Sequence, residues 1–124
     1  MGRSRIVGWT LDRADRERLL RRYPPRYPRV VADHVTFGKA DEAPSMPDHD
    51  RARVVGRADD GEGVEALVVA LGGGTGRWDG STYHVTWSLA HGREPVESNA
   101  VIQERGWEAI EDGPEMGLKP AEWP

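Results

Sequence analysis

Short stretches in which apolar residues alternate with polar ones, or run together, recur along the chain and are typical of β-strands. They predict strands over residues 5–11, 29–37, 52–58, 64–71, 83–90 and 107–110. Two other stretches fit helices. One runs from a cap at Asp12 to about residue 23, where two prolines stop it, and one spans 95–105 with Ser98 as its candidate cap. Because strands and helices do not alternate regularly, the pattern predicts an α+β fold.

The segments between these elements are loops by composition. Residues 38–50 are rich in charged residues and proline, residues 59–63 are rich in turn formers and suit a hairpin, and residues 72–82 are rich in glycine. Residues 111–124 show no usable periodicity. We therefore expect a single domain over residues 1–124, with its core at about 5–110 and a tail at 111–124 whose role stays open.

One tripeptide occurs twice, each time inside a predicted strand: His34-Val35-Thr36 and His84-Val85-Thr86. Side chains two residues apart in a strand share a face, so each motif presents an imidazole beside a hydroxyl. The intervening residues are mainly apolar and face the core, which gives each strand a packed face and a chemical face. By the same alternation Ser88 falls on the chemical face.

Two histidines with hydroxyl neighbours suit one reaction in particular. Histidine titrates near neutral pH, so one imidazole can act as general base and a second as general acid. Cleavage of a phosphodiester needs both, and threonine hydroxyls can donate to the phosphate oxygens where charge builds up. The bland alternative is that His-Val-Thr is simply good strand sequence. The repetition favours the chemical interpretation.

The paired motifs resemble the 2H phosphoesterase superfamily, which is named for two His-x-Thr/Ser motifs. Its members include cyclic phosphodiesterases and 2′-5′ RNA ligase-like proteins. Tyr27-Pro28 before the first motif, residues 79–83 before the second, and residues 95–99 look like a small bacterial branch, and the resemblance covers about residues 5–110. The motifs lie only 50 residues apart, which is short for the family and suggests a trimmed groove.

The resemblance implies a two-lobed α+β fold of antiparallel sheets with helices packed outside and a central groove that carries both motifs. It implies metal-independent hydrolysis of a 2′,3′-cyclic phosphate, or a related nucleotide or RNA-end phosphodiester, without cofactor. His34 and His84 would be the acid/base pair, with Thr36 and Thr86 holding the phosphate. Ser88 and Asn99 are further candidate substrate contacts. Which histidine is the base stays open.

Other features are weaker candidates. The run Gly72–Gly76 lacks the ending of a phosphate-binding P-loop and suits a flexible connection or a groove lid better. Arg77 and Trp78 at its end are candidates for contacting a nucleotide, but packing in a satellite cluster under the loop is favoured. Asp48-His49-Asp50 contains metal-ligand types, but no second histidine cluster supports a metal site. Asn99 either helps to cap a helix or touches substrate from the helix start.

Composition and charge narrow the function classes further. With no cysteine, disulfides and thiolate chemistry are excluded. Residues 1–30 hold nine arginines against three acidic residues, a net charge of +6. Because the whole chain has a net charge of −4, the remaining 94 residues have a net charge of −10. The basic arm suits an anionic partner or a solvated helix face with internal ion pairs, while the overall acidity argues against a binder of duplex DNA. No signal peptide or membrane segment is expected, which fits a cytoplasmic protein.

The sequence thus favours a phosphodiesterase acting on a nucleotide or RNA-end substrate. A binding module for nucleotides or RNA ends, with little or no turnover, is the main alternative. A small structural or interaction protein is the third interpretation, and it predicts that the two histidines do not face each other.

Overall fold

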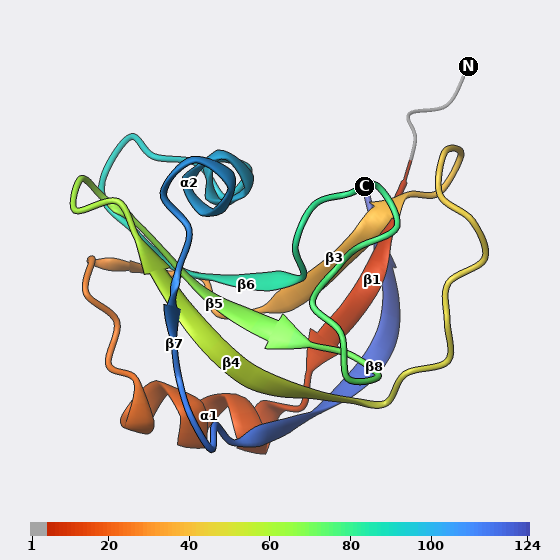
Figure 1. The fold of residues 1–124 in the computed structure, drawn as a ribbon, viewed down its shortest axis with the longest axis horizontal. Coiled ribbons are helices and arrows are strands. Elements are labelled where there is room, and N and C mark those ends of the chain that lie inside the picture. Colours follow the sequence, from red (N-terminus) through yellow and green to blue (C-terminus); the bar gives the residue numbers. More distant parts are fainter. Residues whose placement is uncertain (1–4) are drawn as a thin grey trace.

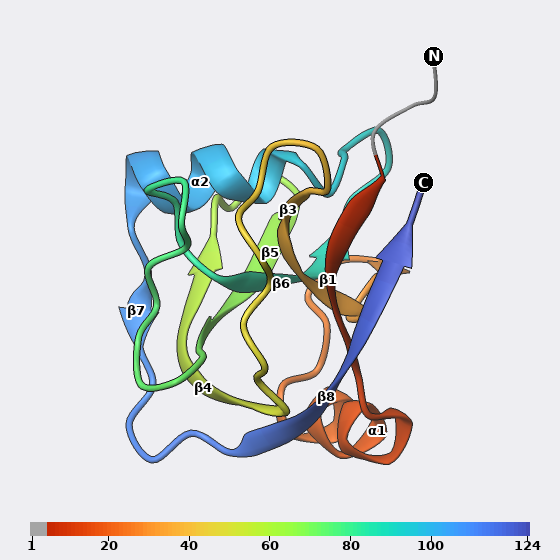
Figure 2. The same cartoon turned by 90° about the vertical axis from the view of Figure 1, so that its right-hand side faces the viewer.

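A computed structural model describes residues 5–124. Residues 1–4, which include Arg3 of the basic arm and begin the segment in which no signal peptide is expected, lie outside the described residues. The chain forms, in order, β1 (Ile6–Leu11), α1 (Arg13–Arg22), β2 (Arg29–Val30), β3 (His34–Lys39), β4 (Arg51–Asp59), β5 (Val64–Ala70), β6 (His84–Leu89), α2 (Glu97–Arg105), β7 (Glu108–Ala109) and β8 (Glu115–Trp123). Antiparallel strands dominate, and the two helices lie on opposite sides of the molecule (Figures 1 and 2). The predicted α+β class is confirmed.

The strands form one sheet in the order β2-β6-β5-β4-β8-β1-β3, with β7 pairing β4 outside this path. The sheet is strongly curved (Figure 1), so that β3 at one end lies close to β6 near the other. The backbone between β2 and β3 continues the pairing on both sides. The N–H of Ala32 donates to the Thr86 carbonyl at 2.9 Å, and the Leu11 N–H donates to the Asp33 carbonyl at 3.0 Å. One bent segment therefore joins the two ends of the sheet.

The sequence prediction of a single strand over 29–37 is corrected by this bend. The structure has two short strands, and between them Ala32 adopts a positive φ of 43° and is fully buried. Such a backbone conformation is uncommon for alanine and interrupts regular pairing. The break transfers the chain from β6 to β1, so the first histidine motif begins beside the strand that carries the second.

The C-terminal residues form a central strand, β8, where no element was predicted. It pairs with β1 along its second half and with β4 along its first. Met116 is fully buried. The core therefore extends well past residue 110. The C-terminal end of β8 lies beside β1, and β1 also pairs with β3, the strand of the first motif.

Apolar side chains pack on both faces of the sheet. The larger cluster fills the concave interior and contains Trp9, Val35, Val85 and Trp87. A second cluster joins the outer face of β4–β6 to Val101 and Ile102 of α2. As predicted, Val35 and Phe37 of β3 and Tyr83, Val85 and Trp87 around β6 face the interior. The histidines and threonines of the motifs are thereby directed to the other face.

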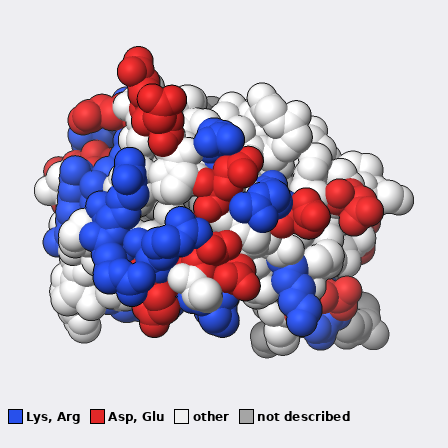
Figure 3. All heavy atoms as spheres, turned by 90° about the horizontal axis from the view of Figure 1, so that it is seen from below, with Lys and Arg blue, Asp and Glu red and all other residues white. Residues whose placement is uncertain are grey.

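The basic N-terminal region is tied into the structure by ion pairs. Asp12 caps α1 as predicted, accepting from the Asp15 N–H at 2.9 Å. Arg13 pairs with Asp33 and Arg26 with Asp59. Figure 3, which views the α1 side, shows Lys and Arg gathered with Asp and Glu interspersed. This supports a solvated face with internal ion pairs for the described part of the arm. No helix within residues 5–124 is long and apolar enough to span a bilayer.

Candidate functional site

Both histidine motifs line one cavity of about 230 Å³. β3 contributes His34 and Thr36, and β6 contributes His84 and Thr86. The remaining lining residues are Ile6, Arg77, Pro95, Val96, Asn99 and Trp123. This arrangement differs from the expectation of the third interpretation, in which the two histidines do not face each other. The cavity lies between the start of α2, the end of the glycine-rich loop and the first residues of β3.

His84 is held in a defined orientation and is almost completely buried, with 8% of its surface exposed. Its Nδ1 lies 2.9 Å from the Thr82 carbonyl oxygen. A carbonyl only accepts, so Nδ1 carries the proton and Nε2 is the accepting nitrogen of the neutral ring. Burial lowers the pKa of His84 below its ordinary 6.5. The positive charges of Arg77 and His34 lower it further, and the Thr82 contact acts in the opposite direction. At neutral pH His84 is therefore a free base.

His34 has a different environment. Its Nδ1 lies 3.2 Å from the carboxylate of Asp33, which also accepts from Arg13 at 3.2 Å. The ring of Trp123 packs against the imidazole with the centroids 4.5 Å apart. The Asp33 contact orients the His34 ring through Nδ1. The two histidines thus have different surroundings, since the Nδ1 of His84 contacts a backbone carbonyl and the Nδ1 of His34 contacts a carboxylate.

Arg77 places a buried positive charge in the same cavity, with only 8% of its side chain exposed. Its guanidinium donates to the carboxylate of Asp79, the carbonyl of Thr36 and the side-chain oxygen of Asn99. These four bonds use all but one of the five N–H donors, so one Nη1 donor has no partner among residues 5–124. The contact to Thr36 ties Arg77 to the first motif, and the contact to Asn99 ties it to α2.

The sequence interpretation placed Arg77 mainly in a satellite cluster under the loop. Its lining of the cavity makes it a stronger candidate anion ligand than that interpretation gave. The signal available in the sequence was a lone cation at the end of a glycine-rich loop, directly before the second motif. Because loop geometry decides where such a side chain points, this signal does not locate it.

The hydroxyls of the two motif threonines differ in their hydrogen bonds. Thr86 donates to the Pro95 carbonyl at 3.2 Å and lies 2.8 Å from the Ser98 hydroxyl. Its hydroxyl therefore anchors α2 to β6 in this state. The Thr36 hydroxyl makes no hydrogen bond within the described residues and remains available to a ligand. The predicted capping role of Ser98 is wrong, because α2 is capped at Val96 without a side-chain bond and Ser98 is buried against Thr86.

Ser88 lies apart from the cavity despite sharing its parity with His84 and Thr86. In the pairing of β5 with β6, Glu65 faces Ser88 while the next residue, Ala66, faces Thr86. β6 thus contains one extra residue at Trp87, and such a bulge reverses the alternation beyond it. Ser88 instead donates to the buried Glu65 carboxylate at 2.5 Å and accepts from the Tyr27 N–H at 3.2 Å.

Asn99 does reach the cavity, from the first turn of α2. Its side-chain oxygen accepts from Arg77 at 3.2 Å, and its amide nitrogen donates to the Val96 carbonyl at 3.1 Å. It therefore positions Arg77 and lines the site. The Asp48-His49-Asp50 run lines a separate cavity. Within residues 5–124, no group of three or more histidine or acidic side chains is arranged to hold a metal ion.

Comparisons with known proteins add no relative to this geometry. No protein-family model matches the chain. No curated protein and no solved structure gives a significant match. The cavity and the residues that line it are therefore the features that indicate a function.

Proposed function

We propose that this protein is a phosphodiesterase of the 2H type that hydrolyses a 2′,3′-cyclic phosphate, or a related nucleotide or RNA-end phosphodiester, without a metal ion. The observation that carries the proposal is the convergence of His34, His84 and Arg77 on one cavity. A base, an acid and an anion ligand are the groups that a phosphodiester displacement requires. The resemblance to the 2H superfamily and a cytoplasmic site of action belong to the same proposal.

The different surroundings of the histidines support a division of roles between them. His84, whose pKa is lowered by burial, accepts a proton from water at Nε2 as the water oxygen attacks phosphorus. The bond from phosphorus to one ribose oxygen breaks as the new bond forms. His34, oriented by Asp33, is the general acid in this scheme and gives a proton from Nε2 to that leaving oxygen. The proton gained by His84 and the one lost by His34 return through solvent, so the enzyme is restored.

The phosphate would be held by the remaining polar groups of the cavity. Arg77 offers its charge and its remaining Nη1 donor, and the Thr36 hydroxyl offers a second donor. These groups stabilise the negative charge that develops on the non-bridging oxygens. In the two-lobed form of the proposal, β3 with its neighbours and β6 with its neighbours are the two lobes, and each carries one motif to the substrate.

A nucleotide-binding module without turnover is the second candidate, and one observation favours it. The Thr86 hydroxyl is held by Pro95 and Ser98 instead of facing the cavity as a free donor. Hydrolysis in this cavity requires either that Arg77 and Thr36 suffice or that Thr86 turns toward the phosphate. Measurement of turnover decides between the two candidates.

The direct test is hydrolysis of the four 2′,3′-cyclic nucleotides in the presence of EDTA. Wild-type protein is compared with the His34→Ala and His84→Ala variants and with His91→Ala, an exposed histidine outside the cavity. We expect each cavity variant to lose about 10²-fold or more in rate, and His91→Ala to match wild type. Nucleotide binding without turnover by wild type would favour the binding module instead.

A further inference from the structure

A second cavity of about 240 Å³ adjoins the one that holds the histidines, and the two share Asn99 as a lining residue. Residues 79–82 form one wall of the second cavity, and Asn99, Ile102 and Gln103 of α2 form the other. A ligand anchored at the histidines can therefore extend past Asn99 into the second cavity.

The two cavities differ in charge. The histidine cavity contains Arg77, whereas no lysine or arginine lines the second, which instead contains the carboxylate of Asp79. No cation among residues 5–124 lines the second cavity to bind a second phosphate. The wall offers Ile102 as an apolar surface and the exposed Gln103 amide, a donor and an acceptor with no hydrogen bond to other described residues. This chemistry suits a flat, uncharged ring with polar edges.

The loop wall is built to a fixed shape. The Gly80 N–H donates to the Arg77 carbonyl at 3.0 Å, and the Arg77 N–H donates to the Ser81 carbonyl at 2.8 Å. Gly80 adopts a positive φ of 88°, which closes this turn. Asp79 accepts from Ser81 and Arg77, so the turn is linked to the cation of the neighbouring cavity. These hydrogen bonds connect the walls of the two cavities.

We infer that the second cavity binds the nucleobase of the substrate, with Gln103 reading the edge of the base. The inference rests on the proposed function, because it places the phosphate between the histidines. Glutamine pairs through its amide with adenine, and Asp79 as an acceptor favours a base with an exocyclic amino group. Adenine is therefore preferred over uracil. Gln103 is a specificity-determining residue in this assignment and takes no part in proton transfer.

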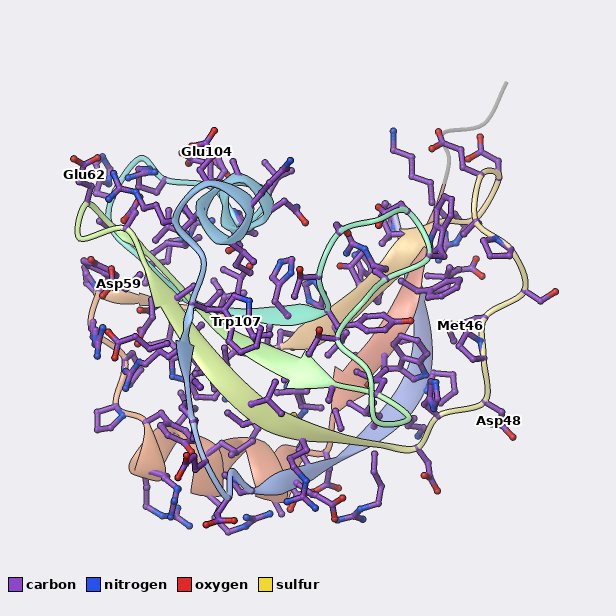
Figure 4. All side chains as sticks on the ribbon, in the orientation of Figure 1. Met46, Asp48, Asp59, Glu62, Glu104 and Trp107 are labelled. Atoms are coloured by element: carbon purple, nitrogen blue, oxygen red, sulfur yellow. The ribbon has the colours of Figure 1, made fainter. Side chains whose placement is uncertain are left out.

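The experiment measures binding, so that it does not depend on turnover. Adenosine 3′-monophosphate, uridine 3′-monophosphate and inorganic phosphate are titrated into wild type, Gln103→Leu and a control, Glu104→Gln, on the same helix. Glu104 points to the outer side of α2 (Figure 4). We expect Gln103→Leu to weaken the adenosine nucleotide about tenfold, to reduce the preference over the uridine nucleotide, and to leave phosphate binding unchanged. Glu104→Gln should match wild type throughout.

The outcomes separate the inference from the proposed function. Equal affinity of wild type and Gln103→Leu for the adenosine nucleotide would overturn the inference, and so would failure of wild type to bind any nucleotide. If nucleotide affinity depends on Gln103 but wild type hydrolyses no cyclic nucleotide, the base site stands and the phosphodiesterase proposal fails. If turnover occurs with equal rates on all four bases in both proteins, the proposed function stands and the base site is refuted.

Discussion

Trp123, near the C-terminus, places its ring against the imidazole of His34, with the centroids 4.5 Å apart and the planes inclined by 55°. The contact connects β8 with the first histidine motif. Because Asp33 also contacts the imidazole through Nδ1, the ring of His34 is held by the segment before β3 and by β8. A catalytic imidazole needs such restraint, since a displacement of about 1 Å can cost 10²-fold in rate.

Replacing Trp123 with alanine should lower kcat by about tenfold or more while the melting temperature changes little, because the side chain is only partly buried. Trp123→Phe should restore most of the rate, since an aromatic ring again supports His34. Steady-state kinetics and thermal unfolding measure the two effects. Trp107→Ala is the control, because that tryptophan lies over β4, outside the histidine cavity. Equal loss of activity in both variants would contradict a specific role for Trp123.

The acidic side of the pH–rate profile should report His84. Its pKa is lowered by burial, so the imidazole stays neutral as the pH falls to 6.5 and takes up a proton only below that value. We expect kcat/KM to hold down to pH 6.5 and to fall below it. The free energy of unfolding should fall over the same range, because the unfolded chain binds a proton at about pH 6.5 and the native chain does not. An acidic midpoint above pH 7 would contradict the assignment of His84 as base.

Arg77→Gln should weaken phosphate binding and shift the acidic midpoint to higher pH. The positive charge of Arg77 contributes to the lowered pKa of His84, so removing it raises that pKa. Titration with inorganic phosphate and a pH–rate profile measure both effects. Arg77→Lys keeps the charge without the forked contacts to Thr36 and Asn99. It should keep the acidic midpoint while binding phosphate more weakly than wild type. A midpoint that is unchanged in Arg77→Gln would contradict this electrostatic coupling.

Ser88→Ala should reduce stability without changing KM. The substitution leaves the buried Glu65 carboxylate and the Tyr27 N–H without one partner each, which costs about 1–3 kcal/mol. Denaturant unfolding and kinetics at a temperature where the variant is folded separate the two quantities. Thr36→Val provides the contrast. The Thr36 side chain lines the cavity, so its replacement should lower kcat/KM with little change in stability. A raised KM in Ser88→Ala would restore its predicted contact with substrate.

Met116→Ala should destabilise the protein by about 2–5 kcal/mol, the usual cost of a cavity left by a fully buried side chain. Lys119→Ala, at an exposed position of the same strand, should change the free energy of unfolding by less than about 0.5 kcal/mol. Urea unfolding followed by tryptophan fluorescence gives both values. A small effect of Met116→Ala would mean that the C-terminal strand is not part of the cooperative unit.

The elements that the sequence predicted well are those whose patterns are local. Alternation placed Val35 and Val85 inside and the motif histidines outside, and Asp12 marked the start of α1. The misses depend on contacts between distant residues. The bulge at Trp87 reverses the face of Ser88, and the turn at Ala32 divides a predicted strand, yet neither leaves a compositional mark. β8 was missed because its first part pairs with β4 and its second with β1, so its polar and apolar residues do not alternate in one continuous pattern. Pro120 weakens the strand pattern further.

The candidate site shows the same division. The repeated tripeptide identified His34 and His84, and strand parity predicted that they present chemical faces. Their convergence on one cavity requires the curved sheet and the bent segment that joins its ends. Arg77 and Trp123 enter the cavity from a loop and from the terminal strand, 41 and 89 residues beyond Thr36 and His34 respectively. No local pattern connects residues at such separations.

The most direct test of the account is the rate of hydrolysis of a 2′,3′-cyclic nucleotide by the double variant His34→Ala/His84→Ala, measured beside both single variants and wild type. If the two imidazoles act as one acid/base pair, each single variant loses about 10²-fold or more and the double variant loses little beyond that. A single variant that retains a rate within a few-fold of wild type would contradict two-histidine catalysis in this cavity.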